Sequence, residues 1–145
     1  MIVVFDLDGT LADISHRLCF IKYPPKDWET FFARVNLDKP KQPIIDLTHR
    51  FHQCGDTVII CSGRRSECRE ATEEWLKTHN VKYSELLMRE IDDRRSDVDV
   101  KKEMLEYIKQ KYGQMPDLAI DDRQRVVDFW RSQGIICLQC DQWEE

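Results

Sequence analysis

The stretch Ile2 to Thr10, IVVFDLDGT, decides how the chain folds. Its first four residues are β-branched or aromatic, which is typical of a buried strand. Asp6 and Asp8 follow where this strand ends, and Gly9 allows a sharp turn. Ligands of open α/β sheets bind at the carboxyl ends of strands. The paired carboxylates can therefore bind a divalent cation, attack an electrophile or transfer protons. An ordinary acidic turn is the alternative.

Strand-like apolar runs alternate with helical patterns along the rest of the chain. Apolar residues recur at helical spacing in residues 44–51, 66–76, 100–108 and 126–130, with Ser66 as the expected N-cap of the second helix. This alternation predicts an α/β fold with a parallel five-stranded sheet and helices on both faces. The predicted strands are Ile2–Phe5, Thr57–Cys61, Leu86–Met88, Leu118–Ile120 and Ile135–Leu138.

About fifty residues separate the first two predicted strands, more than one crossover needs. Within them, Trp28, Phe31, Phe32 and Val35 form an apolar stripe at helical spacing. We predict one domain over residues 1–145, with a small helical insertion at about residues 14–43 near the mouth of the site. The stripe is compatible with a lid and equally with an ordinary packed helix.

The composition is that of a globular domain. The 145 residues are 41% hydrophobic and 34% charged, with a net charge of −5. This charge argues against a broad electrostatic contact with nucleic acid, but it permits a local basic pocket around Arg64-Arg65 or Arg94-Arg95. No apolar run approaches the ~20 residues of a membrane span, and the N-terminus does not read as a signal peptide. We therefore expect a cytoplasmic protein without membrane contact.

The six cysteines are expected to be reduced in that compartment. Cys137 and Cys140 have the spacing of a metal or redox pair. They lie in the apolar run around Ile135, and no second ligand pair is visible, which favours a buried structural strand.

Two later segments suit the binding of a phosphate group. Ser62-Gly63-Arg64 follows the second predicted strand and offers a hydroxyl, close backbone approach and a guanidinium fork that fits phosphate oxygens. Lys101 is expected near the start of a helix, where the helix dipole disfavours a cation. A buried anion opposite it, such as Asp6 or a phosphate, would offset that cost. A solvated lysine is the alternative.

A second pair of acids, Asp121 and Asp122, follows the fourth predicted strand. Adjacent carboxylates at a strand end repel one another unless a cation neutralises them. Together with Asp6 and Asp8, they form an oxygen-rich site of the kind that Mg²⁺ prefers. The sequence therefore predicts Mg²⁺ as the cofactor.

The order D-L-D-G-T, S-G-R, Lys and D-D resembles the haloacid dehalogenase (HAD) superfamily of aspartyl phosphotransferases, and it extends from Asp6 to Asp122. The resemblance implies a Rossmann-like sheet, Mg²⁺ and a phosphoaspartyl intermediate. It implies that Asp6 is the nucleophile and that Asp8 is the acid and then the base, which requires a raised pKa for Asp8. The phosphoryl group would be held by Ser62 and Lys101. The other implied substrate contacts are Thr10, Gly63 and Arg64, and the implied metal ligands are Asp6, Asp8, Asp121 and Asp122.

Arg17 and the tracts 93–101 and 120–131 are similar to the phosphatase domain of bacteriophage-type polynucleotide kinase-phosphatases. This similarity implies the removal of 3′-phosphates from nucleic-acid ends and nucleotides, with Arg17 and Arg64 near the substrate's phosphates. A G-x-x-x-x-G-K-[ST] loop does not occur in the sequence, so a 5′-kinase activity is not expected from it. A separate kinase partner and a homo-oligomer both stay open.

Two rival functions and several plainer interpretations remain. A nucleoside 5′-monophosphatase, or a phosphatase of another small metabolite, would keep the chemistry and change the substrate. A receiver-like module would hold its phosphoryl group as a signal, but Asp8 argues against it because a long-lived signal needs no proton-transfer group. Arg17 could simply form an ion pair within the insertion. Arg123 and Arg125 suit a solvated helix face, and Phe129 and Trp130 suit the core.

Overall fold

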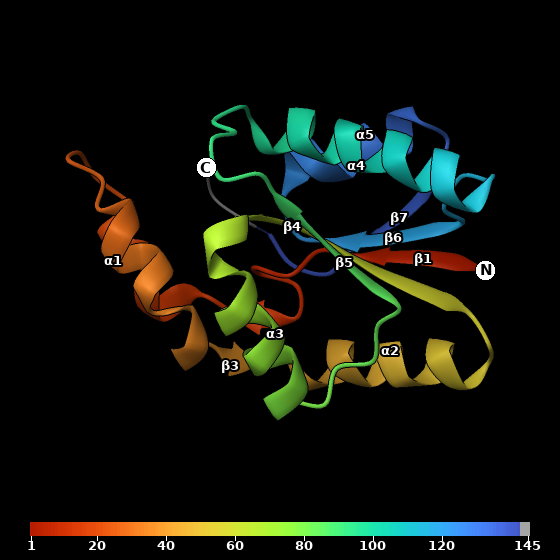
Figure 1. The fold of residues 1–145 in the computed structure, drawn as a ribbon, viewed down its shortest axis with the longest axis horizontal. Helices are drawn as coiled ribbons and strands as arrows, with labels where there is room; N and C mark the ends of the chain where they lie inside the picture. Colours follow the sequence, from red (N-terminus) through yellow and green to blue (C-terminus); the bar gives the residue numbers. More distant parts are fainter. Residues whose placement is uncertain (143–145) are drawn as a thin grey trace.

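The computed structural model describes residues 1–142. Its centre is a five-stranded parallel sheet in the order β5-β4-β1-β6-β7 (Figure 1). This sheet confirms the predicted fold class and the five predicted strands, each within a few residues at its ends. The strands are β1 (Ile2–Phe5), β4 (Thr57–Arg65), β5 (Glu85–Arg89), β6 (Leu118–Asp121) and β7 (Ile136–Gln139).

Helices cover both faces of this sheet. The helices α2 (Gln42–Gln53) and α3 (Arg69–Thr78) pack on one face, and α4 (Asp97–Tyr112) and α5 (Gln124–Ser132) on the other (Figure 1). Successive side chains of a strand point to opposite faces, so β1 contributes to both cores. All four of its residues are buried for this reason, which explains why β1 reads as a continuous apolar run.

The strand β4 is longer than predicted. Its pairing with β5 continues to Arg65, with a shift of register between Ser62 and Arg65. The Ser62-Gly63-Arg64 tripeptide therefore lies within the end of the strand and not after it. Ser66 is consequently not the N-cap of an α-helix, because it begins the 3₁₀ turn η3 (Ser66–Cys68), and α3 starts only at Arg69.

The segment between β1 and α2 stands beyond the carboxyl ends of the sheet strands (Figure 1). Two short strands, β2 (Ala12–Asp13) and β3 (Lys39–Pro40), pair antiparallel at its base. Between them lie η1 (Ser15–Phe20), α1 (Trp28–Ala33) and η2 (Val35–Leu37). The predicted apolar stripe packs only in part, because Phe31 and Val35 are buried whereas Trp28 is 44% exposed.

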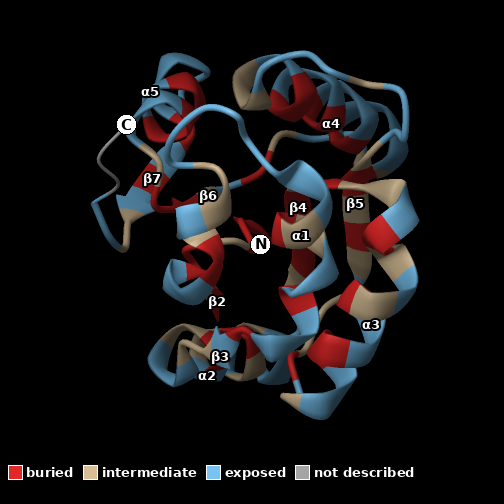
Figure 2. Ribbon diagram, turned by 90° about the vertical axis from the view of Figure 1, so that its left-hand side faces the viewer, coloured by how far each residue is buried: buried red, intermediate tan, exposed pale blue. Residues whose placement is uncertain are grey.

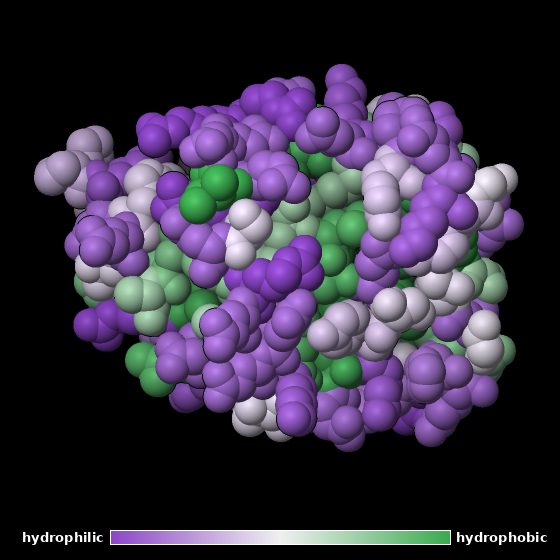
Figure 3. All heavy atoms as spheres, viewed as in Figure 1, coloured by the Kyte–Doolittle hydropathy of each residue, from purple (hydrophilic) through white to green (hydrophobic). Residues whose placement is uncertain are grey.

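The surface follows from this layering. Figure 2 looks onto the edge where the sheet strands end and shows buried strands between helices whose outer sides are exposed. In Figure 3, hydrophobic side chains gather over the edge strand β5, between the hydrophilic surfaces of the helices. Cys137 is buried in β7, as the structural interpretation of the cysteine pair predicted. Within residues 1–142, no helix is long and apolar enough to cross a membrane.

Candidate active site

The carboxyl ends of three neighbouring strands deliver the predicted polar residues to one place. Asp6 follows β1 directly, Asp121 is the last residue of β6, and Ser62 lies near the end of β4. Lys101 comes from the second turn of α4, whose N-cap is Ser96. Because parallel strands end at the same edge of a sheet, residues more than a hundred positions apart meet there.

Three carboxylates and one ammonium group form the centre of the site. Oxygens of Asp6, Asp121 and Asp122 all lie within 4.8 Å of one another, and all three residues are buried. The Nζ of Lys101 donates to Asp6 Oδ1 at 2.8 Å and to the carbonyl oxygen of Cys61 at 2.5 Å, and it lies 3.6 Å from Asp121 Oδ2. Lys101 is thus a buried lysine facing an anion, as the first of the two sequence interpretations predicted.

This cluster carries more negative than positive charge. Burial raises the pKa of Asp6 well above its usual value, Asp121 raises it further, and Lys101 opposes the increase. Burial and the neighbouring Asp121 raise the pKa of Asp122 to about 6. Burial alone would lower the pKa of Lys101, but Asp6 and Asp121 outweigh it and hold that pKa above its normal value. The surplus negative charge is what a bound cation would compensate.

The donor set fits a hard divalent cation. Asp6, Asp121 and Asp122 offer oxygen atoms from three side chains, and Mg²⁺ is bound by carboxylates and water. Two of these carboxylates are held in place: Asp121 accepts hydrogen bonds from its neighbouring backbone N–H groups and from Trp130 Nε1, and Thr10 Oγ1 lies 3.3 Å from Asp6 Oδ2. These residues could therefore hold Mg²⁺.

Asp8 lies apart from that group and faces two buried arginines. Its Oδ1 accepts from Arg17 Nη2 at 2.9 Å, and from Arg64 Nε and Nη2 at 2.9 and 2.7 Å. Burial raises the pKa of Asp8, but the charges of Arg64 and Arg17 outweigh it, so the pKa is lowered. One expectation is corrected here, because the pKa of Asp8 is not raised. Its carboxylate lies outside the group of Asp6, Asp121 and Asp122, since the guanidinium groups hold it, and its role as a metal ligand stays a prediction.

Asp38 completes this arginine pair. It accepts from Arg17 Nε and Nη2, each at 2.8 Å, and from Arg64 Nη2 at 3.0 Å. His16 Nε2 lies 2.6 Å from the same carboxylate. Arg17 is fully buried, and its Nη1 has no hydrogen-bond partner among the residues that the structure describes. Arg17 therefore forms an ion pair within the insertion, with Asp38, as its plainer interpretation predicted. Arg17 and Arg64 also form ion pairs with Asp8.

The remaining predicted substrate contacts surround the site but differ in access. Gly63 and Arg64 line the cleft, whereas Thr10 and Ser62 do not, and the side chains of Arg64, Thr10 and Ser62 are all buried. The Oγ of Ser62 accepts from the backbone N–H of Arg64 at 3.1 Å. Gly9 has φ +87°, and a Cβ there would overlap the Asp122 carboxylate. The roles proposed for these residues in substrate binding stay predictions.

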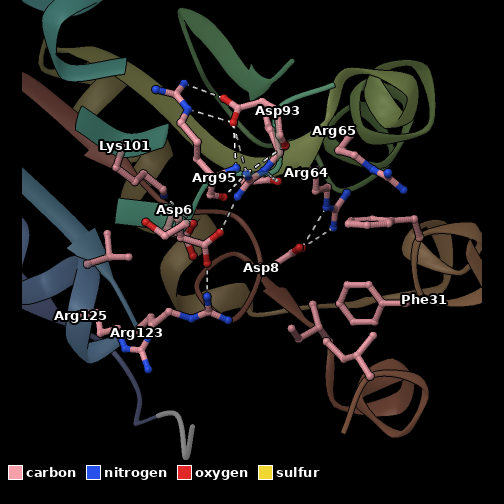
Figure 4. A pocket seen from close by; sticks show the side chains of 18 of the residues that line it. Asp6, Asp8, Phe31, Arg64, Arg65, Asp93, Arg95, Lys101, Arg123 and Arg125 are labelled. Atoms are coloured by element: carbon pink, nitrogen blue, oxygen red, sulfur yellow. Dashed lines mark hydrogen bonds and ion pairs between the residues drawn. The ribbon is translucent and has the colours of Figure 1, made fainter. Parts of the chain in front are cut away.

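A cleft of about 690 Å³ opens above these groups, between the insertion and the body of the molecule (Figure 4). Asp6, Asp8 and Lys101 lie at its floor. Apolar side chains of the insertion line one side, and arginines from the loop after β5, the loop after β6 and the first turn of α5 line the other, as Phe31 across from Arg95, Arg123 and Arg125 shows in Figure 4. The apolar side chains are Ile14, Ile21, Trp28, Phe31 and Phe32, and the arginines include Arg94, Arg95, Arg123 and Arg125.

Sequence reasoning missed two acids of the site. Asp38 follows the helical stripe with no motif around it, so its contact with the arginine pair could be found only in three dimensions. Asp97 starts α4 and forms ion pairs with Arg89 and Arg123. It also lies 3.1 Å from where a Cβ of Gly63 would be. An acidic residue directly after the N-cap Ser96 is a common helix start, and that signal says nothing of its arginine partners.

Comparison with known proteins shows two levels of similarity. The family described as the polynucleotide kinase PNKP phosphatase domain matches over residues 1–144. The chain is 31% identical to the Pnkp1 chain of a Pnkp1/Rnl/Hen1 complex, with a TM-score of 0.79, covering 99% of this chain and 46% of that one. For Pnkp1 of a Pnkp1/Rnl/Hen1 RNA repair complex, the identity is 30% and the TM-score is 0.77. This match covers 99% of this chain and 43% of that one. The chain therefore spans less than half the length of these relatives.

A more distant match shows the fold alone. A hydrolase from Streptococcus pneumoniae TIGR4 is 17% identical, with a TM-score of 0.67, over 97% of this chain and 92% of that chain.

Proposed function

This chain belongs to the family of polynucleotide kinase PNKP phosphatase domains and is a HAD-type phosphatase, and from that premise we propose that it removes 3′-phosphates from nucleic-acid ends or nucleotides in a Mg²⁺-dependent reaction through a phosphoaspartyl intermediate. The observation that carries the chemistry is the buried group of Asp6, Lys101, Asp121 and Asp122.

The first step would transfer the phosphoryl group to Asp6. A carboxylate oxygen of Asp6 forms a bond to phosphorus, the bond from phosphorus to the ester oxygen breaks, and Asp8 gives that oxygen a proton. This step needs Asp8 in its protonated form, which Arg17 and Arg64 disfavour in the substrate-free structure, so binding of the substrate phosphate has to weaken their hold on Asp8. Lys101 stands beside Asp6 and can neutralise charge on the phosphoryl oxygens. Mg²⁺ held by Asp6, Asp121 and Asp122 would supply the further positive charge that lets an anionic nucleophile approach a phosphate.

The second step would hydrolyse the acyl phosphate. Asp8 takes a proton from water, the water oxygen bonds to phosphorus, and the bond between phosphorus and Asp6 breaks, which restores the carboxylate and releases phosphate. The contacts of Asp8 with Arg17 and Arg64 favour its carboxylate form, which is the form that this step needs.

The substrate proposal rests on the family and on the cleft. The arginine side of the cleft suits an anionic ligand larger than a lone phosphate. In the Pnkp1 relatives the matching region belongs to a longer chain within a complex. An association of this protein with a separate kinase or other repair partners, and its cytoplasmic location, belong to the same proposal.

A panel of substrates with and without Mg²⁺ tests this proposal. We expect repeated turnover, dependent on Mg²⁺, with 3′-phosphorylated oligonucleotides and nucleoside 3′-monophosphates, and slower release of phosphate from nucleoside 5′-monophosphates. Preference for 5′-monophosphates would replace the substrate proposal with the rival one. Asp6→Asn should abolish turnover, because an amide cannot serve as this nucleophile, while its circular dichroism spectrum stays that of the wild type. Hydrolysis by that variant at a near-normal rate would refute the role of Asp6.

A further inference from the structure

We propose that His16 is a positioning residue for the reaction: it holds Asp38, which in turn holds the two arginines beside Asp8. This inference rests on the proposed function, because it takes Asp8 to be the group that exchanges protons with the ester oxygen and with water. His16 does not line the cleft, so it would act on the reaction only through these contacts.

The base of the insertion brings His16 to Asp38. The strands β2 and β3 pair antiparallel there with Asp13 opposite Lys39, so the residues just after Asp13 and just before Lys39 leave the pair at the same end. His16 lies in the first turn of η1, whose start is fixed by a hydrogen bond from the backbone N–H of Ser15 to Asp13 Oδ1 at 2.9 Å. Two side chains that are 22 positions apart in the sequence thereby come into contact.

This contact is a hydrogen bond whose direction follows from the other partners of Asp38. The Nε2 of His16 lies 2.6 Å from Asp38 Oδ1, and Arg17 Nε donates to the same oxygen at 2.8 Å. The second oxygen, Asp38 Oδ2, accepts from Nη2 of Arg17 and from Nη2 of Arg64. A carboxylate that faces two guanidinium groups only accepts hydrogen bonds. The proton of this bond therefore belongs to His16 Nε2, which donates it to Asp38.

The four charges that His16 adjoins balance one another. The two guanidinium groups face the carboxylates of Asp8 and Asp38, and the side chains of both arginines and of Asp38 are fully buried. The side chain of His16 is 34% exposed, so this network reaches the surface of the insertion there. In its neutral form, His16 gives Asp38 a hydrogen bond and shelter from water without disturbing the balance of charge. Ion pairs that are kept dry are stronger than hydrated ones.

Loss of this hydrogen bond would change how the two arginines are shared between their carboxylate partners. The backbone of Asp38 would stay in place, because its carbonyl oxygen accepts from Trp75 Nε1 at 2.9 Å, but its carboxylate would gain access to water. A carboxylate in contact with water attracts a guanidinium group less strongly than a dry one, so the arginines would be held mainly by Asp8. Asp8 would then be less free to reach the ester oxygen, and we expect its proton transfer to slow.

Two aryl esters separate this effect from a general loss of activity. The leaving group of phenyl phosphate needs a proton far more than that of p-nitrophenyl phosphate, and both esters carry the same phosphate group. His16→Asn, whose amide is too short to reach Asp38, should lower kcat/KM for phenyl phosphate about tenfold, a part of the ~10²–10⁴-fold that a positioned acid contributes. For p-nitrophenyl phosphate, this variant should lose about twofold at most. His16→Gln, whose amide nitrogen reaches the place of Nε2, should keep both values near those of the wild type.

Two further variants complete the test, with all proteins assayed at a temperature where circular dichroism shows them folded. His52→Asn is the matched control, because His52 is an exposed histidine of α2 outside the cleft, and it should change neither value. Asp8→Asn tests the proposed function by itself, and equal losses on the two esters for that variant would refute the acid role of Asp8.

The inference about His16 has its own contrary outcomes. If Asp8→Asn loses more on phenyl phosphate while His16→Asn loses equally on both esters, or on neither, His16 does not position Asp8. A loss for His16→Gln as large as that for His16→Asn would also overturn the inference, because the hydrogen bond to Asp38 would then not be what matters.

Discussion

Lys101→Met should destabilise the metal-free protein strongly. The variant keeps most of the side-chain volume and removes the ammonium group that lies 2.8 Å from Asp6 and 3.6 Å from Asp121. Three buried carboxylates would then be left without this counter-charge. Breaking a buried ion pair by removing one partner costs about 3–5 kcal/mol. Because the raised pKa values of Asp6 and Asp122 allow partial protonation, we expect the lower end of that range.

Thermal denaturation followed by circular dichroism measures this effect. A loss of about 3 kcal/mol should lower the melting temperature in EDTA by roughly 10 °C for a chain of this size. The deficit should shrink when Mg²⁺ is added, because the cation restores positive charge between the carboxylates. It should also shrink at acidic pH, where Asp6 and Asp122 are protonated.

Lys102→Met is the matched control, since Lys102 is the next residue of α4 and is exposed. This control should change the free energy of unfolding by no more than about 0.5 kcal/mol. A Lys101→Met protein as stable in EDTA as Lys102→Met would refute the reasoning, because the buried ion pair would then contribute nothing to folding. An equal deficit with and without Mg²⁺ would argue against a cation among these carboxylates.

Three further predictions concern the same region. The raised pKa of Asp122, about 6, means that the folded metal-free protein binds a proton more tightly than the unfolded chain, so the stability that this group contributes is present below about pH 4 and is lost as the pH rises through about 6. In urea denaturation with EDTA, the free energy of unfolding of the wild type minus that of Asp122→Asn should therefore fall as the pH rises over that window. A rise of this quantity would contradict the prediction. Gly9→Ala should abolish the stabilisation of the folded protein by Mg²⁺, because the new Cβ would overlap the Asp122 carboxylate. The control Gly55→Ala, at φ +81° in open space, should cost only about 1 kcal/mol of strain and keep the response to Mg²⁺. Asp38→Asn should lower the free energy of unfolding by about 1.5–3 kcal/mol and reduce kcat, since it weakens the charged hydrogen bonds that hold Arg17 and Arg64 beside Asp8. The control Asp46→Asn, at an exposed position, should leave the free energy of unfolding and kcat near their wild-type values.

The fold could be predicted because its signals are local. A short β-branched run followed by acids indicates a strand that ends at a site, and β1 with Asp6 is such a case. The strand β4 shows the limit: nothing in Ser62-Gly63-Arg64 indicates that pairing with β5 continues to Arg65, because a register shift depends on the neighbouring strand. Ser66 was therefore wrongly predicted as the N-cap of α3.

The candidate site divides in the same way. Asp6, Lys101 and the two acids at the end of β6 could be predicted to meet, because strand ends converge at one edge of a parallel sheet. The pKa of Asp8 was predicted in the wrong direction. Its two arginine partners come from segments separated by almost fifty residues, and Asp38, which holds both of them, stands in no motif.

By itself, the sequence determined the layered α/β architecture and the place of the acidic centre, because hydrophobic periodicity and the residues directly after each strand are properties of contiguous chain. Only the tertiary structure decided which charges pair with one another and which surfaces face across the cleft. Ion pairs such as Arg17 with Asp8, and the position of Phe31 across the cleft from Arg95, depend on how the insertion packs on the sheet (Figure 4). The energy of such contacts falls off with distance in space, and separation along the chain does not encode that distance.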